Sequence, residues 1–399
     1  MRKKFLKLVF ALFAAILVIP LVSCSSDDDS VKNYTVTLSV GLPSGITADN
    51  VENLEIILTK GTKSDTIHAA NLDITTWTKT LPQGQYTIKA QGKVKDEAAA
   101  YLTGTASVDL YANSAVTLQL TKNVKSPLIF KSLYTTGGQT GYMVDGYFEI
   151  VNNSDEVQYL DGLILSAPQG KQTNANAWQA NGFENLYNCG QGTVIAFPGS
   201  GKDYPLQPGE SVLIAQDAAN HAELAGNGNY CVDLSKANFE IYIDNVKAEI
   251  DYPATNMKII FQNNAYMRAF GLGFLGRAYI LAKLPTGITP EAFAANSANL
   301  MTTPGSTSST QYLMIPSKYV LDAVDIWDPD SGTHYGTFLP SDDQEGVLGS
   351  TAWAGQCVRR KVIKIENGRP YYQDTNNSSQ DFLTNQPLTP GVTPTTVDK

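Results

Sequence analysis

The sequence contains little histidine, little cysteine and fewer basic than acidic residues. Of 399 residues, 3 are His and 4 are Cys, and 38 Asp and Glu outnumber 29 Lys and Arg, which gives a net charge of −9. An acidic chain has no electrostatic basis for holding nucleic acid, so we expect no nucleic-acid partner. Few His residues are available for acid–base catalysis, and no Gly-x-Ser-x-Gly, His-Glu-x-x-His or P-loop motif occurs. We therefore expect a protein that is not an enzyme, with a hydrolase that uses paired carboxylates as the less favoured alternative.

The first residues have the pattern of a targeting signal. Four Lys and Arg residues precede an apolar stretch at residues 8–22, which is shorter than the roughly 20 residues that a membrane span needs. The pattern predicts a signal peptide at residues 1–23. Residues 21–24 (Leu-Val-Ser-Cys) resemble the lipobox of bacterial lipoproteins, and the resemblance implies that Cys24 carries lipid. An ordinary secretory signal is the alternative. Removal of residues 1–23 deletes four positive charges and takes the net charge from −9 to −13.

Residues 24–33 are interpreted as an acidic tether. Asp27, Asp28 and Asp29 follow two serines after the cysteine. Cys-Ser-Ser-Asp-Asp-Asp resembles the export tag of Bacteroidota lipoproteins. The resemblance implies a protein anchored by lipid in the outer membrane and exposed on the cell surface. A solvated linker on a protein that stays in the periplasm is the alternative.

Three cysteines follow the tether: Cys189, Cys231 and Cys357. An exported protein can form disulfides, but three cysteines cannot all pair within one chain. We predict one bridge, between Cys189 and Cys231. Three buried or free thiols are an equally weighted alternative. No Cys-x-x-Cys or Cys/His cluster indicates zinc.

Residues 34–122 show the alternation of β-strands. Apolar residues occupy every second position at 34–40 and 54–58, and again after a turn at 82–85 (Pro-Gln-Gly-Gln). Pro and Gly set the turn, and alternate positions after it face inward. About seven short strands over about 90 residues predict a β-sandwich. The segment resembles the prealbumin-like modules of surface lipoproteins, which implies that it is a spacer and platform.

Residues 127–399 are predicted to form a second, larger all-β unit. Pro127 interrupts the first strand pattern, and further apolar strands follow at 147–151, 160–165 and 319–327. Residues 148–154 (Phe-Glu-Ile-Val-Asn-Asn-Ser) resemble the opening strand of lamin-tail-like domains. Other motifs of that group are matched by residues 160–163, 206–210, 324–327 and 374–382.

Within that group, the sequence most resembles an uncharacterised Bacteroidota surface-lipoprotein family, domain of unknown function 4876. The resemblance covers roughly residues 128–393, with insertions at about 167–200, 218–258 and 285–318. It implies an immunoglobulin-like β-sandwich with loop and short-helix insertions, and a place beside an outer-membrane uptake receptor. A shared fold does not identify a ligand.

Residues 325–332 (Asp-Ile-Trp-Asp-Pro-Asp-Ser-Gly) are a candidate calcium site, although an ordinary turn is the favoured interpretation. Asp328 and Asp330, followed by Gly332, have the spacing with which consecutive carboxylates wrap Ca²⁺, and Asp325 could contribute. The Glu at the twelfth position of an EF-hand loop is missing, because Leu339 stands there. The favoured alternative is an ordinary turn without metal.

Residues 265–284 form an apolar stretch interrupted by three glycines. The favoured interpretation is a core strand at 277–281 that follows a Gly-rich loop. The alternative is an exposed loop that docks a partner or ligand, because aromatic, Met and Arg side chains form the centres of interfaces. The residues of this predicted docking loop are Tyr266, Met267, Phe270, Phe274 and Arg277.

These features predict an anchored surface protein with a binding or accessory role. The leading hypothesis is capture of a nutrient (an iron carrier, haem or a glycan) and its transfer to a TonB-dependent outer-membrane receptor. A structural or adhesive surface protein that binds host or matrix components is the alternative. No organic cofactor is expected, and Ca²⁺ is the one candidate ion.

Overall fold

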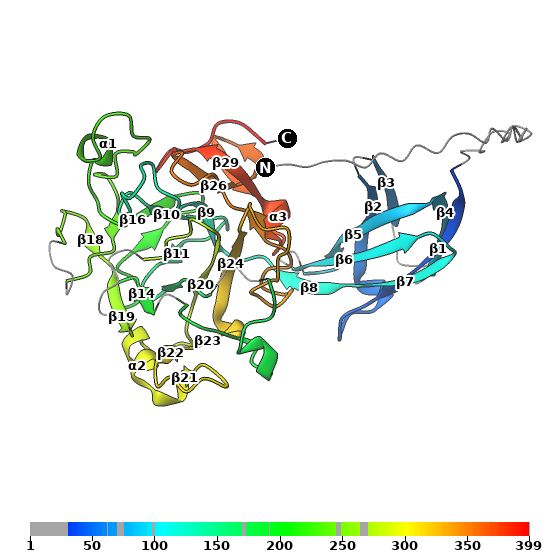
Figure 1. Cartoon of the computed structure of the whole chain (residues 1–399), viewed down its shortest axis with the longest axis horizontal. Helices are drawn as coiled ribbons and strands as arrows, with labels where there is room; N and C mark the ends of the chain where they lie inside the picture. Colours follow the sequence, from blue (N-terminus) through cyan, green and yellow to red (C-terminus); the bar gives the residue numbers. More distant parts are fainter. Residues whose placement is uncertain are drawn as a thin grey trace, which may run out of the picture.

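A computed structural model describes residues 31–61, 63–69, 76–97, 100–169, 173–190, 192–244, 249–263 and 270–398. These residues form strands with a few short helices, which confirms the predicted all-β fold. An N-terminal unit and a larger C-terminal unit lie side by side (Figure 1). Among the described residues, no helix has the length and apolar character needed to cross a membrane.

Two sheets pack together in the N-terminal unit. One has the order β4 (Thr76–Pro82), β1 (Asn33–Gly41), β7 (Ser114–Gln119). The other has the order β3 (Lys63–Ala69), β2 (Val51–Lys60), β5 (Gly84–Val94), β6 (Ala100–Leu110), β8 (Thr121–Val124), and the 3-10 helix η1 (Ala48–Asn50) precedes β2. Every second residue of β5 is buried, because alternate side chains face the opposite sheet. The core between the sheets includes Leu38, Leu58 and Ile88.

Two larger sheets form the C-terminal unit. The first has the order β18 (Thr255–Asn256), β17 (Phe239–Glu240), β16 (Ser211–Ala215), β10 (Tyr147–Asn152), β9 (Leu128–Tyr134), β26 (Gln356–Arg360), β29 (Phe382–Pro387). The second has the order β19 (Lys258–Gln262), β14 (Thr193–Ala196), β12 (Ile164–Ser166), β20 (Arg277–Ala282), β24 (Val320–Trp327), β25 (Val347–Leu348). A core that includes Phe148 and Tyr279 joins the two sheets. Every residue of β9 and β10 is buried, since loops and ribbons cover the outer face of the first sheet.

Two-stranded ribbons and short helices lie outside the two sheets of this sandwich. The ribbons pair β11 (Gln158–Tyr159) with β15 (Pro205–Leu206), β13 (Leu186–Tyr187) with β23 (Ile315–Pro316), β21 (Leu300–Thr302) with β22 (Gln311–Leu313), and β27 (Val362–Glu366) with β28 (Arg369–Tyr372). The helices are α1 (His221–Leu224), α2 (Pro290–Ala295), α3 (Ser378–Asp381), η2 (Gln179–Asn181), η3 (Ser297–Asn299) and η4 (Ser317–Tyr319). α2 begins where the Thr289 hydroxyl accepts from the Ala292 amide and Pro290 takes the first helical position.

The two units meet at the end of the N-terminal unit where β8 leads into β9. The Tyr101 hydroxyl donates to Asn376 Oδ1 at 2.9 Å, and Lys89 Nζ lies 3.1 Å from Glu345 Oε2. β1 runs parallel to β7, and β7 leads through β8 to this junction. Residue 33 therefore lies at the end of the N-terminal unit that is farther from the C-terminal unit. Figure 1 shows α1 on the opposite side of the C-terminal unit.

Candidate functional site

Five loops of the C-terminal unit meet where β9 ends and β20 begins, at the end of the sandwich that we call the loop face. The loops are residues 137–143, 226–230, 270–276, 328–336 and 349–355. Backbone hydrogen bonds connect two of these loops to the residues that follow β9 and a third to the loop at residues 137–143. The amide of Trp353 donates to Thr136 O, and the amide of Gly273 donates to Thr135 O. The amide of Tyr230 donates to the next loop, at Gly138 O.

A stacked aromatic pair lies at the centre of the loop face. The rings of Phe274 and Trp353 stack with centroids 4.4 Å apart, and both side chains are half-buried. Trp353 has a φ of 61°, in the left-handed region that bulky residues avoid, and such a conformation costs about 1–3 kcal/mol. Gly137 packs closely against the indole, since a Cβ there would lie 2.7 Å from the ring. The contacts with Phe274 and Gly137 therefore hold the indole in one place.

A second aromatic pair continues the loop face. Trp327 and His334 stack with centroids 4.7 Å apart and ring planes 11° apart. The two pairs are adjacent through residues 274–276, because Gly276 comes so close to the end of β24 that a Cβ would lie 2.5 Å from Ile326 O. Two further aromatic side chains of these loops are exposed, Tyr230 at 63% and Tyr335 at 43%.

The described residues of the loop face carry few charges, and Arg268, in the connection that leads into residues 270–276, lies outside them. Of its 35 residues, only Asp328 and Asp330 are charged, whereas 17% of the whole chain is charged. Gly, Ser, Thr, Asn and aromatic residues make up most of the remainder. Antibody binding loops have a similar composition, because rigid aromatic rings supply contact area and small polar side chains supply hydrogen bonds.

Buried hydrogen bonds fix the loop at residues 137–143. Asp145 Oδ2 accepts from the Tyr134 hydroxyl at 2.6 Å and from the Gly138 amide at 2.9 Å. The Tyr142 hydroxyl lies 2.7 Å from His221 Nδ1. Burial lowers the pKa of His221, so its imidazole is neutral near pH 7. These groups are engaged with one another beneath the loop, which makes them structural supports for the loop face.

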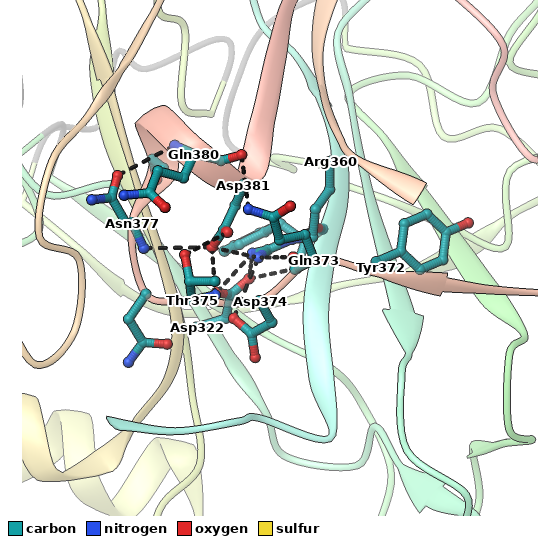
Figure 2. Close-up of polar contacts among 12 residues, drawn as sticks. Asp322, Arg360, Tyr372, Gln373, Asp374, Thr375, Asn377, Gln380 and Asp381 are labelled. Atoms are coloured by element: carbon teal, nitrogen blue, oxygen red, sulfur yellow. Dashed lines mark hydrogen bonds and ion pairs between the residues drawn. The ribbon is translucent and has the colours of Figure 1, made fainter. Parts of the chain in front are cut away.

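A buried ionic cluster lies in the C-terminal tail, near the junction between the units (Figure 2). Arg360 is 1% exposed, with Nη2 2.7 Å from Asp322 Oδ2 and Nη1 3.4 Å from both Asp374 and Asp381. Its guanidinium also lies 4.5 Å from the centre of the Phe382 ring. Burial raises the pKa of Asp322 and of Asp374, which Arg360 partly opposes. The cluster is enclosed, so its role is to fasten the tail to β24 and β26.

The amino-acid sequence and the fold both have known relatives. Residues 207–389 match the family model described as "Protein of unknown function (DUF4876)". A crystal structure of a DUF4876 family protein from Bacteroides thetaiotaomicron VPI-5482 is similar, with 25% identity and a TM-score of 0.61 over 91% of this chain and 99% of that chain. A DUF3823 family protein from Parabacteroides merdae ATCC 43184 shows 16% identity and a TM-score of 0.16, over 35% of this chain and 67% of that chain. No protein with a curated description matches.

The family model and the Bacteroides thetaiotaomicron structure confirm the predicted resemblance to DUF4876. The matched segment includes four of the five loops of the loop face, and the loop at residues 137–143 precedes it. The likeness to lamin-tail domains stays a prediction.

The predicted docking loop is divided by the structure. Phe270 is fully buried and packs edge-on against Phe148, so its assignment to an exposed loop was wrong. Phe274 lies at the loop face. Arg277 turns inward, where its Nε donates to Leu272 O at 2.6 Å. Tyr266 and Met267 lie outside the described residues.

The predicted calcium cage is also not formed. No three His, Cys, Asp or Glu side chains of the described ranges come close enough to share a metal ion. Asp325 is buried and accepts from the Thr337 amide at 2.8 Å. Asp328 Oδ1 accepts from the Asp330 amide at 3.0 Å, which is the hydrogen bond of an Asx-type turn. Asp328 and Asp330 therefore form an ordinary turn, which was the favoured interpretation of this segment.

The predicted disulfide is absent, because Cys189, Cys231 and Cys357 are free, buried thiols. Cys189 lies in a core beneath the second sheet, where its Sγ accepts from the Leu313 amide at 3.3 Å. Cys231 follows the loop at residues 226–230. Burial raises the pKa of both Cys189 and Cys231 to about 12, so neither is a reactive thiolate. Cys24, Asp27, Asp28 and Asp29 lie outside the described residues.

Sequence reasoning missed most of the loop face and the ionic cluster. Trp327 ends β24, Trp353 and Tyr230 lie in two separate loops, and no local spacing connects the three residues. For the cluster, the paired Arg359 and Arg360 in an acidic chain were a usable signal, since a buried strand that carries arginine needs carboxylate partners.

Proposed function

We propose that this chain is a lipid-anchored surface protein that captures a nutrient at the loop face and passes it to a TonB-dependent outer-membrane receptor. The observation that carries the proposal is the position of the loop face. Its loops at residues 137–143, 270–276 and 349–355 adjoin the end of β9, whereas β8 of the N-terminal unit leads into the start of β9, and residue 33, the last residue of the tether, lies at the far end of the N-terminal unit. A chain anchored at Cys24 would present these loops outward, with the N-terminal unit as a spacer.

The lipobox-like motif and the aspartates after it support the anchored half of the proposal. Acyl chains on Cys24 would hold the protein at the bilayer, since each buried CH₂ contributes about 0.8 kcal/mol. Three candidate nutrients fit a surface receptor system: an iron carrier, haem or a glycan. The aromatic side chains of the loop face support a binding role.

Two variants test anchoring and export separately. Labelled palmitate should enter the wild-type protein and should not enter Cys24→Ser. Replacing Asp27, Asp28 and Asp29 together by Asn should leave labelling unchanged but should protect the protein from protease added to intact cells. Wild-type protein that resists this protease while a known surface protein is digested would refute the proposal.

The receptor half is tested by purification from detergent-solubilised membranes. The intact lipoprotein should co-purify with an outer-membrane barrel, and deletion of its gene should slow growth on one limiting nutrient. Normal growth of the deletion strain on each candidate nutrient, without a co-purifying barrel, would contradict capture and transfer. Such a strain that instead fails to adhere to host or matrix components would establish the adhesive alternative.

A further inference from the structure

A buried carboxylate holds the connection between the two units. The Ser126 amide, between β8 and β9, donates to Asp374 Oδ2 at 3.1 Å, and both residues are buried. We infer that the junction takes up a proton at Asp374 as it closes, so that it is tight in mild acid and loosens as the pH rises past neutrality. This inference goes beyond the proposed function, and it depends neither on anchoring nor on the loop face.

The other two carboxylates of the Arg360 cluster are well supplied with hydrogen-bond donors. Asp322 accepts from Arg360 Nη2 at 2.7 and 2.9 Å and from the Phe130 amide at 2.6 Å. Asp381 accepts from the amide of Thr375 at 2.8 Å and from its hydroxyl at 2.7 Å. Hydrogen bonds of this kind stabilise the charged form of a carboxylate.

Asp374 has the weakest partners of the three carboxylates. Among the described residues, its side chain contacts the Ser126 amide and, at 3.4 Å, Arg360 Nη1. One guanidinium cannot balance three ionised carboxylates, and an uncompensated charge is costly in an enclosed site. Burial therefore raises the pKa of Asp374 to about 7, although Arg360 opposes the rise. Asp374 is the member of the cluster that exchanges a proton near neutral pH.

The N-terminal unit covers the cluster beside Asp374. Tyr101 of β6 is 4% exposed, and its hydroxyl donates to Asn376, two residues beyond Asp374. Burial raises the pKa of Tyr101, and the charges of Asp374 and Asp381 raise it further, so the hydroxyl lies close to these carboxylates. Each unit has a core of its own, and the short connection that contains Ser126 joins them. Separation of the units would therefore admit water to Asp374.

The titratable groups that face Asp374 come from four different elements. They are Arg360 from β26, Asp322 from β24, Asp381 from α3 and Tyr101 from β6. Burial opposes the charge of Arg360, but the three carboxylates outweigh it and raise its pKa, while burial raises the pKa of Tyr101. Neither of these two groups changes its charge between pH 5.5 and pH 8. Proton uptake at the junction therefore belongs to the carboxylates, and Asp374 is the one with the fewest donors.

Proton binding fixes the direction of the effect. In an open junction Asp374 would face water, where its pKa is 3.8, whereas in the closed junction its pKa is about 7. The closed form therefore binds the proton more tightly, and the ratio of closed to open molecules falls as the pH rises between these values. Between pH 5.5 and pH 8 this ratio should fall about 30-fold.

The test measures amide hydrogen exchange in the full chain in detergent at pH 5.5 and pH 8. Mass spectrometry with fragmentation follows the Ser126 amide, and comparison with the intrinsic rate at the same pH gives its protection factor. Protection reports the opening equilibrium even when the open form is rare. The protection of Ser126 should fall about 30-fold from pH 5.5 to pH 8, whereas that of the β5 amides, which follows unfolding of the N-terminal unit, should not show this fall.

Two results in the wild-type protein would overturn the inference. One is a protection factor of Ser126 that stays constant with pH. The other is a protection factor that rises with pH, because an ionised Asp374 would then act only by holding the amide more strongly.

A substitution at the carboxylate assigns the effect to Asp374. Asp374→Asn imitates the protonated carboxyl and should keep Ser126 equally protected at both pH values. Asp398→Asn is the matched control in the same tail. The hydrogen bond from Arg359 lowers the pKa of Asp398, so this carboxylate stays ionised throughout, and its substitution should retain the fall seen in the wild type.

Two further variants separate the carboxylate from the other junction contacts. Glu345→Gln removes the ion pair with Lys89, and Tyr101→Phe removes the hydrogen bond of the hydroxyl. Both should lower the protection of Ser126 at each pH but preserve its fall between them, and they leave the cluster intact if Asp374→Asn does not fold. Loss of the pH dependence in either variant, or its persistence in folded Asp374→Asn, would overturn the inference.

Discussion

Arg360 connects segments of the chain that are far apart in sequence. Its Nε donates to Phe130 O at 2.7 Å, and its guanidinium faces Asp322, Asp374 and Asp381. One buried cation surrounded by three carboxylates is stable only because the charges compensate one another at short range. Loss of the cation would leave these carboxylates buried without a positively charged partner, which is far more costly than loss of an exposed ion pair.

Arg360→Met should therefore lower the free energy of unfolding by about 3–5 kcal/mol, measured by urea denaturation at pH 7. Arg359→Met is the matched control. Arg359 pairs with Asp398 at 2.8 Å, with side chains 17% and 19% exposed, and its loss should cost less than about 2 kcal/mol. If the two substitutions lowered the free energy of unfolding equally, the buried Arg360 cluster would contribute no more to stability than the more exposed Arg359–Asp398 pair.

Glu240 should make stability depend on pH. Burial raises its pKa from 4.5 to about 7, although it accepts hydrogen bonds from the Ala218 and Tyr252 amides. Between these pH values the folded protein binds more protons than the unfolded chain, so the free energy of unfolding falls as pH rises. The contribution of protonated Glu240 to the free energy of unfolding is complete below pH 4.5 and is lost as the pH rises past 7. Glu240→Gln should flatten the stability profile between pH 5 and 8, measured by urea denaturation.

The control for this profile is Glu291→Gln. Its hydrogen bond to Lys258 lowers the pKa of Glu291, so this carboxylate is ionised throughout the window from pH 5 to 8. Its removal should leave the slope unchanged. Burial and the nearby charges of Glu249 and Glu240 raise the pKa of Asp217 to about 7. Asp217 therefore accounts for part of the pH dependence that remains in Glu240→Gln. A profile in Glu240→Gln as steep as the wild-type profile would contradict this assignment.

At the scale of elements, the loop face depends on how closely its loops approach the strand ends. Gly276 precedes β20 with a φ of 86°, and a Cβ there would lie 2.5 Å from Ile326 O and 2.8 Å from the Asp328 amide nitrogen. Both neighbours are backbone atoms of the adjoining strand and loop, which cannot rotate away as a side chain can. The loop at 270–276 can adopt its position only while residue 276 lacks a side chain.

Gly276→Ala should destabilise the protein by more than 2 kcal/mol, about 1 kcal/mol from the left-handed backbone and the rest from the close approach. Gly287→Ala measures the backbone cost alone, because Gly287 has a φ of 89° and no atom close to where its Cβ would lie. It should cost about 1 kcal/mol. Thermal and urea unfolding of both variants give the difference, and equal costs would disprove the close packing at Gly276.

Regular strands were predictable from sequence and the loops were not. The alternation at residues 34–40 predicted β1, and the apolar run at 147–151 predicted β10, because both patterns are local. The predicted strand at 160–165 shortens to β12, since residues 161–163 form a turn in which Gly162 takes a φ of 69°. Phe270 and Phe274 lie four residues apart in one Gly-rich loop, yet one is core and the other surface. Their difference depends on contacts with Phe148 and Trp353, which sequence spacing does not encode.

At the scale of the whole molecule, each unit has its own hydrophobic core. The residues in the core of the N-terminal unit all lie between 36 and 120. The residues in the main core of the C-terminal unit all lie at or after residue 128. The Lys89–Glu345 ion pair across the junction is about one-third exposed on both sides and contributes little. The Tyr101 hydroxyl makes a part-buried hydrogen bond to Asn376, in the tail beside the Arg360 cluster.

A fragment of residues 31–125 should therefore fold alone, with one cooperative transition in scanning calorimetry. Tyr101→Phe should leave that transition nearly unchanged, because the hydroxyl faces water in the fragment. In the full chain, the same substitution leaves Asn376 Oδ1 without its donor and should lower the stability of the N-terminal unit by about 1 kcal/mol. An unfolded fragment, or an equal effect of Tyr101→Phe in both forms, would mean that the N-terminal unit depends on the C-terminal unit in some other way than through this contact.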